Sequence, residues 1–119
     1  MSERIKWIEY KGKKVLKVDY TGLRGDALLN EILRVPSFYE GQVHGSVLVL
    51  TDVRSAHADE KTMAAIKDLT KKTKPYEKKS AVIGVTGIKG ILLSAVKVFA
   101  SHSIAPFSDE KEALDWLVS

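Results

Sequence analysis

The sequence contains no cysteine, and this absence excludes disulfide cross-links, thiolate metal sites and thiol nucleophiles. Long apolar runs are also missing, because no segment approaches the roughly 20 residues that cross a bilayer. Residues 1–7 are charged and alternating and lack the apolar core of a secretory signal. We therefore expect a cytoplasmic protein.

Recognisable catalytic and cofactor motifs are missing as well. The glycines match neither the phosphate-binding pattern G-x-x-x-x-G-K-[ST] nor the dinucleotide pattern G-x-G-x-x-G. A triad of Ser55, His57 and Asp52 can be drawn, but no nucleophile elbow supports it. No metal-ligand spacing relates the three histidines, His44, His57 and His102. We predict that the protein is not an enzyme and uses no metal or cofactor.

The length and composition are those of one folded domain. The chain has 119 residues, of which 45% are hydrophobic and 29% charged. Domains cluster near roughly 100–150 residues, and this length supports one core. No repeat, linker or low-complexity tract divides the chain, so we predict a single domain over residues 1–119.

The formal net charge of +4 is partly concentrated in one lysine-rich stretch. This basic patch comprises Lys71, Lys72, Lys74, Lys78 and Lys79. Such a patch attracts phosphates or an anionic membrane surface. The alternative, which we favour, is a solvated helix end and loop, where lysine complements the helix dipole. Nucleic-acid binding is not expected, because only Tyr76 interleaves an aromatic ring with these lysines.

Hydrophobic periodicity predicts an N-terminal β-hairpin. Residues 4–10 and 13–20 alternate between apolar and polar side chains with the period of a strand. Lys11 and Gly12 between them form a short turn in which the glycine permits positive φ.

Strands and helices alternate along the rest of the chain. Apolar runs at 47–50 and 81–85 are typical of central strands covered on both faces, and we expect them to be parallel neighbours. Helical spacing predicts three helices in this part of the chain. The first follows Asp26, which we expect to act as its cap, the second spans 59–74 and stops at Pro75, and the third spans 88–99. Residues 104–107 fit a short edge strand, and Asp109 and Glu112 have the spacing of a helix cap. The pattern predicts an α/β fold with a mixed, mostly parallel sheet of four or five strands and about four helices.

Several strings in this order resemble the SpoIIAA-like proteins of the STAS-like superfamily. They are Tyr20-Thr21-Gly22-Leu23, Thr51-Asp52-Val53, Lys74-Pro75-Tyr76, Ser80-Ala81-Val82-Ile83-Gly84-Val85-Thr86-Gly87, Phe107 and Ala113-Leu114-Asp115-Trp116-Leu117. The similarity covers roughly residues 5–118. It implies a small STAS-like α/β sandwich that serves in regulation or ligand binding.

The chain departs from this family at a segment that matters for regulation. In the anti-anti-sigma branch, a partner kinase phosphorylates a Ser or Thr in a D-S-S/T-G-type segment. Here the corresponding residues 51–57 read T-D-V-R-S-A-H, without the Ser-Ser/Thr-Gly element. The resemblance leaves Ser55, and secondarily Thr51, as candidate phosphorylation sites.

Candidate binding residues follow the predicted parallel strands, because ligands of such sheets gather beyond the carboxyl ends of the strands. This rule selects the loops 51–58, 86–90 and 107–109, and loop 20–24 if its strand runs parallel to the central one. The candidate ligand- or partner-binding residues are Thr51, Asp52, Arg54, Ser55, Thr86, Gly87, Lys89 and Tyr20. The alternative, which we favour for each loop taken alone, is that these side chains satisfy local backbone groups.

The segment around Thr86, Gly87 and Lys89 combines free backbone N–H groups, a hydroxyl and an ammonium group, which are the parts of an anion site. It also mimics the GXXG loop of KH domains. That loop lies between two helices, whereas residues 81–85 have strand character, so we reject a KH domain.

Two functions follow as hypotheses. The first is a non-catalytic regulatory or protein-interaction module with an unidentified protein partner. The alternative is a carrier of a small apolar or anionic ligand, for which Tyr20, Tyr39, Tyr76 and Trp116 supply amphipathic rings. A homodimer is compatible with either function.

Overall fold

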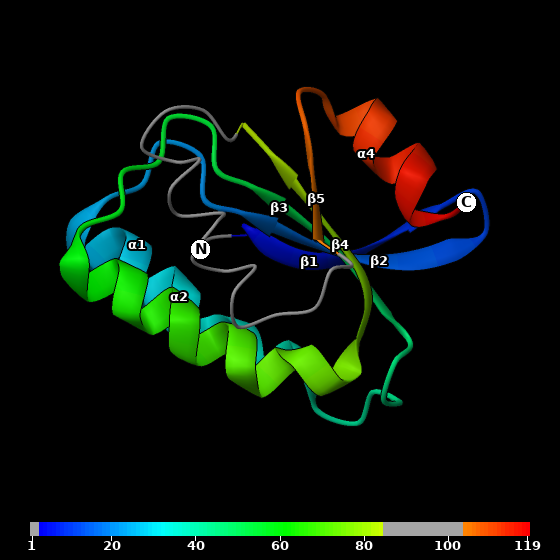
Figure 1. The fold of residues 1–119 in the computed structure, drawn as a ribbon, viewed down its shortest axis with the longest axis horizontal. Helices are drawn as coiled ribbons and strands as arrows, with labels where there is room; N and C mark the ends of the chain where they lie inside the picture. Colours follow the sequence, from blue (N-terminus) through cyan, green and yellow to red (C-terminus); the bar gives the residue numbers. More distant parts are fainter. Residues whose placement is uncertain (1–2, 85–103) are drawn as a thin grey trace.

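The computed structural model describes residues 3–84 and 104–119, and Figure 1 shows a sheet with helices on both of its faces. The strands are β1 (Ile5–Tyr10), β2 (Lys13–Asp19), β3 (Val47–Asp52), β4 (Glu77–Ile83) and β5 (Ile104–Phe107). The α-helices in the described part are α1 (Gly25–Arg34), α2 (Glu60–Thr73) and α4 (Glu110–Leu117). Short 3-10 helices follow two of them, η1 (Val35–Tyr39) and η2 (Lys74–Tyr76).

The N-terminal hairpin forms as its alternation predicts. Strands β1 and β2 are antiparallel and pair Tyr10 with Lys13 across a two-residue turn. Both turn residues, Lys11 and Gly12, have positive φ, at 50° and 79°. This geometry suits a tight hairpin turn, because its twist matches that of the flanking strands.

The two apolar runs lie side by side and point in the same direction. Strand order is β1-β2-β3-β4-β5, and every pair after the hairpin is parallel. The expected parallel neighbours at 47–50 and 81–85 are thus confirmed as β3 and β4, with β4 ending at Ile83. The carboxyl ends of β2, β3, β4 and β5 therefore meet at one edge of the sheet, which we call the carboxyl edge.

Each face of the sheet is covered by different helices (Figure 1). Helices α1 and α2 pack against one another on one face, and α4 packs on the other, against β3, β4 and β5. The core under α1 and α2 includes Leu16, Val18, Leu28, Ile32 and Val49. The core under α4 includes Val15, Leu50, Ala81, Ile83, Ala113 and Leu117. Apolar side chains on both faces explain why the central strands are continuous apolar runs.

Helix α1 begins differently from the expected start. Arg24 is its N-cap, with φ −158° and ψ 166°, and no side chain caps it, whereas Asp26 lies within the first turn. The expected cap at Asp26 is therefore wrong. Arg24 forms a β-bridge with His57 and has extended backbone, so the helix begins at Gly25, two residues before the start that a cap at Asp26 would give. The helix ends at Arg34, and Pro36 lies in the 3-10 turn that follows.

The remaining described helices start as predicted. Asp59 caps α2 through a reciprocal capping box with Thr62, and Asp109 accepts a hydrogen bond from the backbone of Glu112 at the start of α4. The buried residues of α2 are Thr62, Thr70 and Thr73, while Met63 is half-buried and the half-buried Ile66 and Leu69 pack against the core under α1 and α2. Threonine tolerates this position where its hydroxyl donates to a carbonyl one turn back, as at Thr70 and Thr73.

About four helices were expected, and residues 3–84 and 104–119 contain three α-helices. The fourth expected helix, at 88–99, lies outside the described residues. No helix in the described ranges is long and apolar enough to span a membrane.

Candidate functional site

The loops that leave the parallel strands are joined to one another at the carboxyl edge. Backbone N–H groups of Tyr20 and Gly22 donate to the carbonyls of Asp52 and Arg54, at 2.9 and 3.1 Å. The N–H of Val53 donates to Ile83 at 2.9 Å, which ties the next loop to β4. Because β2 runs parallel to β3, loop 20–24 does join the other loops, as the sequence anticipated.

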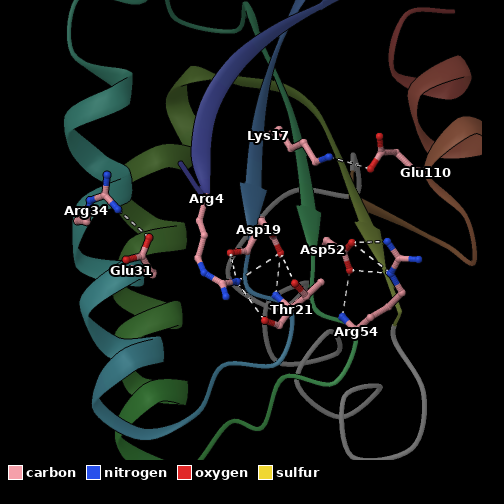
Figure 2. Close-up of polar contacts among 9 residues, drawn as sticks. All are labelled: Arg4, Lys17, Asp19, Thr21, Glu31, Arg34, Asp52, Arg54 and Glu110. Carbon is pink, nitrogen blue, oxygen red and sulfur yellow. Dashed lines mark hydrogen bonds and ion pairs between the residues drawn. The ribbon is translucent and has the colours of Figure 1, made fainter. Parts of the chain in front are cut away.

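Asp52 and Arg54 form the central polar contact of this edge (Figure 2). The guanidinium donates from Nε to both carboxylate oxygens, at 3.0 and 3.1 Å, and from Nη2 to Oδ2 at 2.6 Å. The backbone N–H of Arg54 also donates to Oδ1 at 3.0 Å. The Asp52 side chain is 5% exposed and the Arg54 side chain 53%. A buried carboxylate therefore orients a guanidinium that reaches solvent, and the hydrogen bond to Asp52 raises the pKa of Arg54.

Gly84 provides the space in which Arg54 lies. Its φ is +89°, and a Cβ built on it would lie 3.0 Å from both the Cα and N atoms of Arg54 and closer still to Cγ. A side chain here would therefore collide with the backbone and the first carbons of Arg54. Glycine at this position ends β4 and permits the Asp52–Arg54 geometry.

A second ion pair lies beside the first. Arg4 lies 3.6 Å from Asp19 Oδ1 and donates to the Thr21 carbonyl at 3.0 Å, and Thr21 donates to Asp19 from both its N–H and its hydroxyl, at 2.9 and 2.6 Å. Burial acts to raise the pKa of Asp19, but these hydrogen bonds and the nearby Arg4 outweigh it, so the pKa lies below its ordinary value. Asp19 is ionised near neutral pH.

Asp19 and Asp52 are register partners on neighbouring strands and point to the same face. Like charges in this arrangement destabilise a sheet. An arginine beside each carboxylate offsets the repulsion, and Lys17 on the same face pairs with Glu110 at 3.0 Å. Figure 2 shows these three pairs along the edge, with the Glu31–Arg34 pair separate on α1. In these three pairs of described residues each acidic side chain has a basic partner, and the Arg54 guanidinium is the more exposed member of its pair.

Ser55 lies at the exposed tip of the loop after β3. The Ala56 N–H donates to the Val53 carbonyl at 3.0 Å, which closes a turn around Arg54 and Ser55. Ser55 has φ +61°, a conformation that glycine adopts more easily. Its hydroxyl is accessible next to Arg54, and its phosphorylation stays a prediction.

The other predicted residues lie in different surroundings. Tyr20 is 4% exposed and packs in the core under α1 and α2, where burial raises the pKa of its hydroxyl. Thr51 is half-buried, and strand alternation directs it to the face opposite Asp52. Thr86, Gly87 and Lys89 lie outside the described residues. The structure thus brings Asp52, Arg54 and Ser55 together, whereas the Tyr20 backbone bonds to Asp52 and its side chain turns away into the core.

The basic patch is divided between the two faces of the sheet. Lys79 lies on the α4 side, where its ammonium donates to the Trp116 carbonyl at 2.9 Å and to the Ser119 carbonyl at 3.1 Å. Lys72 pairs with Asp68 on α2 at 3.0 Å, and Lys74 and Lys78 are exposed. Lys79 therefore complements the carboxyl end of α4 rather than extending a surface formed by Lys71 and Lys72.

A polar cluster of the buried Tyr39 and Thr73 with the half-buried Glu77, at the opposite end of the sheet, was not predicted. The Tyr39 hydroxyl donates to Glu77 Oε2 at 3.0 Å, and the Thr73 hydroxyl lies 3.3 Å from the same oxygen. Burial raises the pKa of Glu77 above its ordinary value, against the opposing effect of these two hydrogen bonds. Residues 38 positions apart meet here, and the lysines that flank Glu77 in the sequence suggested only a solvated segment.

Replacing Glu77 with glutamine is expected to flatten the pH dependence of stability in the acid range. Because the folded-state pKa of Glu77 is raised, the folded protein binds this proton more tightly than the unfolded chain. The contribution of Glu77 to stability is therefore greatest below its unfolded pKa and declines as the pH rises through its folded pKa. Urea unfolding of both proteins between pH 4 and 8 measures this. An unchanged difference in unfolding free energy across that range would contradict a raised pKa.

No group of three or more His, Asp or Glu side chains suited to a metal ion occurs in residues 3–84 and 104–119. His44 packs edge-on against Tyr76, with ring centroids 4.7 Å apart, and His57 is exposed. His102 lies outside the described ranges.

No protein-family model matches the chain, and a search of curated proteins also found no match. Among solved structures, the chain is similar to an uncharacterised DUF3478-family protein from Shewanella loihica PV-4 that has a SpoIIAA-like fold. The TM-score is 0.76 at 19% sequence identity, and the alignment covers 95% of this chain and 91% of that chain. The chain therefore has a SpoIIAA-like fold, which confirms the fold that the sequence resemblance implied.

Proposed function

We propose that the protein is a non-catalytic protein-interaction module of the STAS-like type, and that the carboxyl edge around Arg54 and Ser55 is its partner-binding surface. The observation that carries the proposal is the Asp52–Arg54 pair. A buried carboxylate holds an exposed guanidinium in a defined orientation at the edge where sheets of this topology bind ligands. Arginine so positioned loses little freedom on binding and is frequently a dominant interface residue.

Arg54 retains hydrogen-bonding capacity toward a partner. Its bonds to Asp52 use Nε and Nη2, and Nη1 has no hydrogen-bond partner among the described residues. A carboxylate or phosphate on the partner is the group that a guanidinium recognises best. We therefore expect an acidic or phosphorylated protein partner.

The state of the carboxylates supports a binding role over acid–base catalysis. A general acid or base works best with a pKa near the operating pH. The hydrogen bonds from Thr21 and the pair with Arg4 instead hold the pKa of Asp19 below its ordinary value. Both carboxylate oxygens of Asp52 accept hydrogen bonds from Arg54.

Phosphorylation of Ser55 is part of this proposal. A phosphate would add nearly two negative charges beside Arg54. It would compete with Asp52 for the guanidinium and reverse the charge that the edge presents to a partner. A Ser55→Asp variant is therefore expected to bind the same partner more weakly than the unmodified chain.

Replacing Arg54 with alanine is expected to weaken partner binding by about 30-fold, as for a dominant interface residue. Quantitative affinity capture from the native host, with tagged protein and mass spectrometry, identifies the partner, and titration with that partner measures the loss. Arg34→Ala is the matched control, because Arg34 is also exposed and ion-paired but lies on α1. Capture of no reproducible partner would count against a protein-interaction module, and equal binding by the two variants would remove Arg54 from the interface.

The carrier hypothesis stays a prediction. Native mass spectrometry of protein purified without organic solvent, followed by extraction, would show a co-purifying small molecule. A protein recovered empty from its native host would dismiss that alternative.

A further inference from the structure

Strand β1 lies at one edge of the sheet formed by the described residues, and one of its hydrogen-bonding sides is unpaired there. In the described part of the chain it pairs with β2 alone. An edge strand exposes a row of N–H and C=O groups that another strand can complete. The hairpin register determines which residues of β1 direct their N–H and C=O groups away from β2.

The register places the outward groups at Ile5, Trp7 and Glu9. The Asp19 N–H donates to the Arg4 carbonyl at 2.7 Å, so Arg4 directs its backbone groups toward β2. Backbone direction alternates along a strand, so Lys6, Ile8 and Tyr10 also face β2 and the intervening residues face away. The two-residue turn after Tyr10 agrees, because the pair flanking such a turn is hydrogen-bonded.

The two edges of the sheet are not equivalent. Strand β5 has four residues, and one of them, Pro106, has no N–H to donate. Strand β1 has six residues without proline or glycine. A short strand with proline is a common protection against edge pairing, and β1 lacks both features.

We propose that β1 pairs with β1 of a second copy of this chain, antiparallel and centred on Trp7, to form a continuous sheet across a two-fold axis. In this register Ile5 of each copy lies opposite Glu9 of the other, and about six backbone hydrogen bonds use every outward group. Because the two-fold axis is perpendicular to the sheet, the face covered by α1 and α2 lies on the same side in both copies. The two Trp7 rings therefore meet on that face.

The side chains that this pairing brings together are compatible with self-association. Trp7 is half-buried in the monomer and lies under the ammonium of Lys14, 4.2 Å from the ring centroid, so a second ring enlarges an existing apolar and cation–π surface. The next opposed pair is Glu3 with the turn residue Lys11, which are exposed and of opposite charge, and Lys11 also pairs with Asp115 of its own chain at 2.9 Å. This complementarity offsets part of the repulsion between two chains of net charge +4. An interface of one strand is small, so we expect a weak dimer that forms in the micromolar to millimolar range.

Amide hydrogen exchange measured by NMR at about 10 µM and about 1 mM protein tests the proposal on the unmodified chain. Exchange at Ile5, Trp7 and Glu9 is expected to slow by about 10-fold or more at the higher concentration, while Lys6, Ile8 and Tyr10 are protected at both. Sedimentation velocity over the same range is expected to show a monomer–dimer equilibrium. A monomer throughout, or a dimer without added protection at the three outward amides, overturns the proposal.

Glu9→Pro is the matched variant, because it removes an outward N–H and leaves the ladder to β2 intact. It is expected to remain folded and to stay monomeric at about 1 mM, whereas Glu9→Ala, which keeps the N–H, is expected to dimerise. Equal dimerisation by both variants contradicts pairing through β1. Binding of the partner at the carboxyl edge is expected to be unaffected, which separates failure of this proposal from failure of the proposed function.

Discussion

Replacing Gly84 with alanine is expected to reduce the free energy of unfolding by about 2–4 kcal/mol. Gly84 has φ +89°, where an L-residue is strained, and its added Cβ would approach the Cα and N atoms of Arg54 to 3.0 Å. Both are backbone atoms of Arg54, which cannot move aside as the end of a flexible side chain can. The end of β4 and the loop after β3 must therefore separate. Chemical denaturation gives the loss, and the NMR signal of the Arg54 Nε–H reports whether its contact with Asp52 survives.

Gly41→Ala is the matched control for this substitution. Gly41 has φ +79°, and a Cβ there meets nothing within 4 Å. The Gly41→Ala variant is expected to lose the free energy that positive φ costs an alanine, on the order of 1–2 kcal/mol, without a clash of its Cβ with a neighbouring residue. Equal losses in the two variants, with an unchanged Arg54 signal, would mean that Gly84 does not support the candidate site.

Replacing Leu50 with alanine is expected to cost about 2–5 kcal/mol and to lower Tm by about 8–20 °C. Leu50 is fully buried in the central strand β3 and packs in the core under α4. Removing its methyl groups forfeits their burial and leaves a cavity that close-packed neighbours cannot fill. Thermal and urea unfolding of the purified variant measure both quantities.

Leu33→Ala makes the same chemical change on a surface. Leu33 lies on α1 and is 64% exposed, so its truncation is expected to change stability by less than about 0.5 kcal/mol. A large loss at Leu33 together with a small loss at Leu50 would contradict the arrangement in which α4 covers β3.

Local chemistry was sufficient to predict the elements of this fold. Alternation and the Lys11-Gly12 turn predicted the hairpin, and the apolar run at 47–50 predicted a strand buried on both faces. The cap at Asp59 could be predicted because its partner, Thr62, is one helical turn away. The failure at Asp26 shows the limit of this reasoning, since the residue that precedes α1, Arg24, bridges to His57, which is distant in sequence.

The candidate site was predicted only in part for the same reason. The rule that ligands bind beyond parallel strands selected Asp52, Arg54 and Ser55 because these residues follow a recognisable strand. It could not distinguish Tyr20, which lies at the same edge but turns into the core. Strand alternation could have separated Lys79 from the other lysines, because successive residues of β4 point to opposite faces.

By itself, the sequence predicted the strands and α-helices found in residues 3–84 and 104–119, where most of them begin, and that β3 and β4 are parallel neighbours. Periodicity, turns and caps act over a few residues, and short crossovers leave few topologies. The tertiary structure alone decided that Arg54 lies against Gly84, that Arg4 offsets Asp19, and that Tyr39 meets Glu77. These contacts join residues separated by 15 to 38 positions, and a one-dimensional pattern carries no information about which distant side chains a folded chain brings within hydrogen-bonding distance.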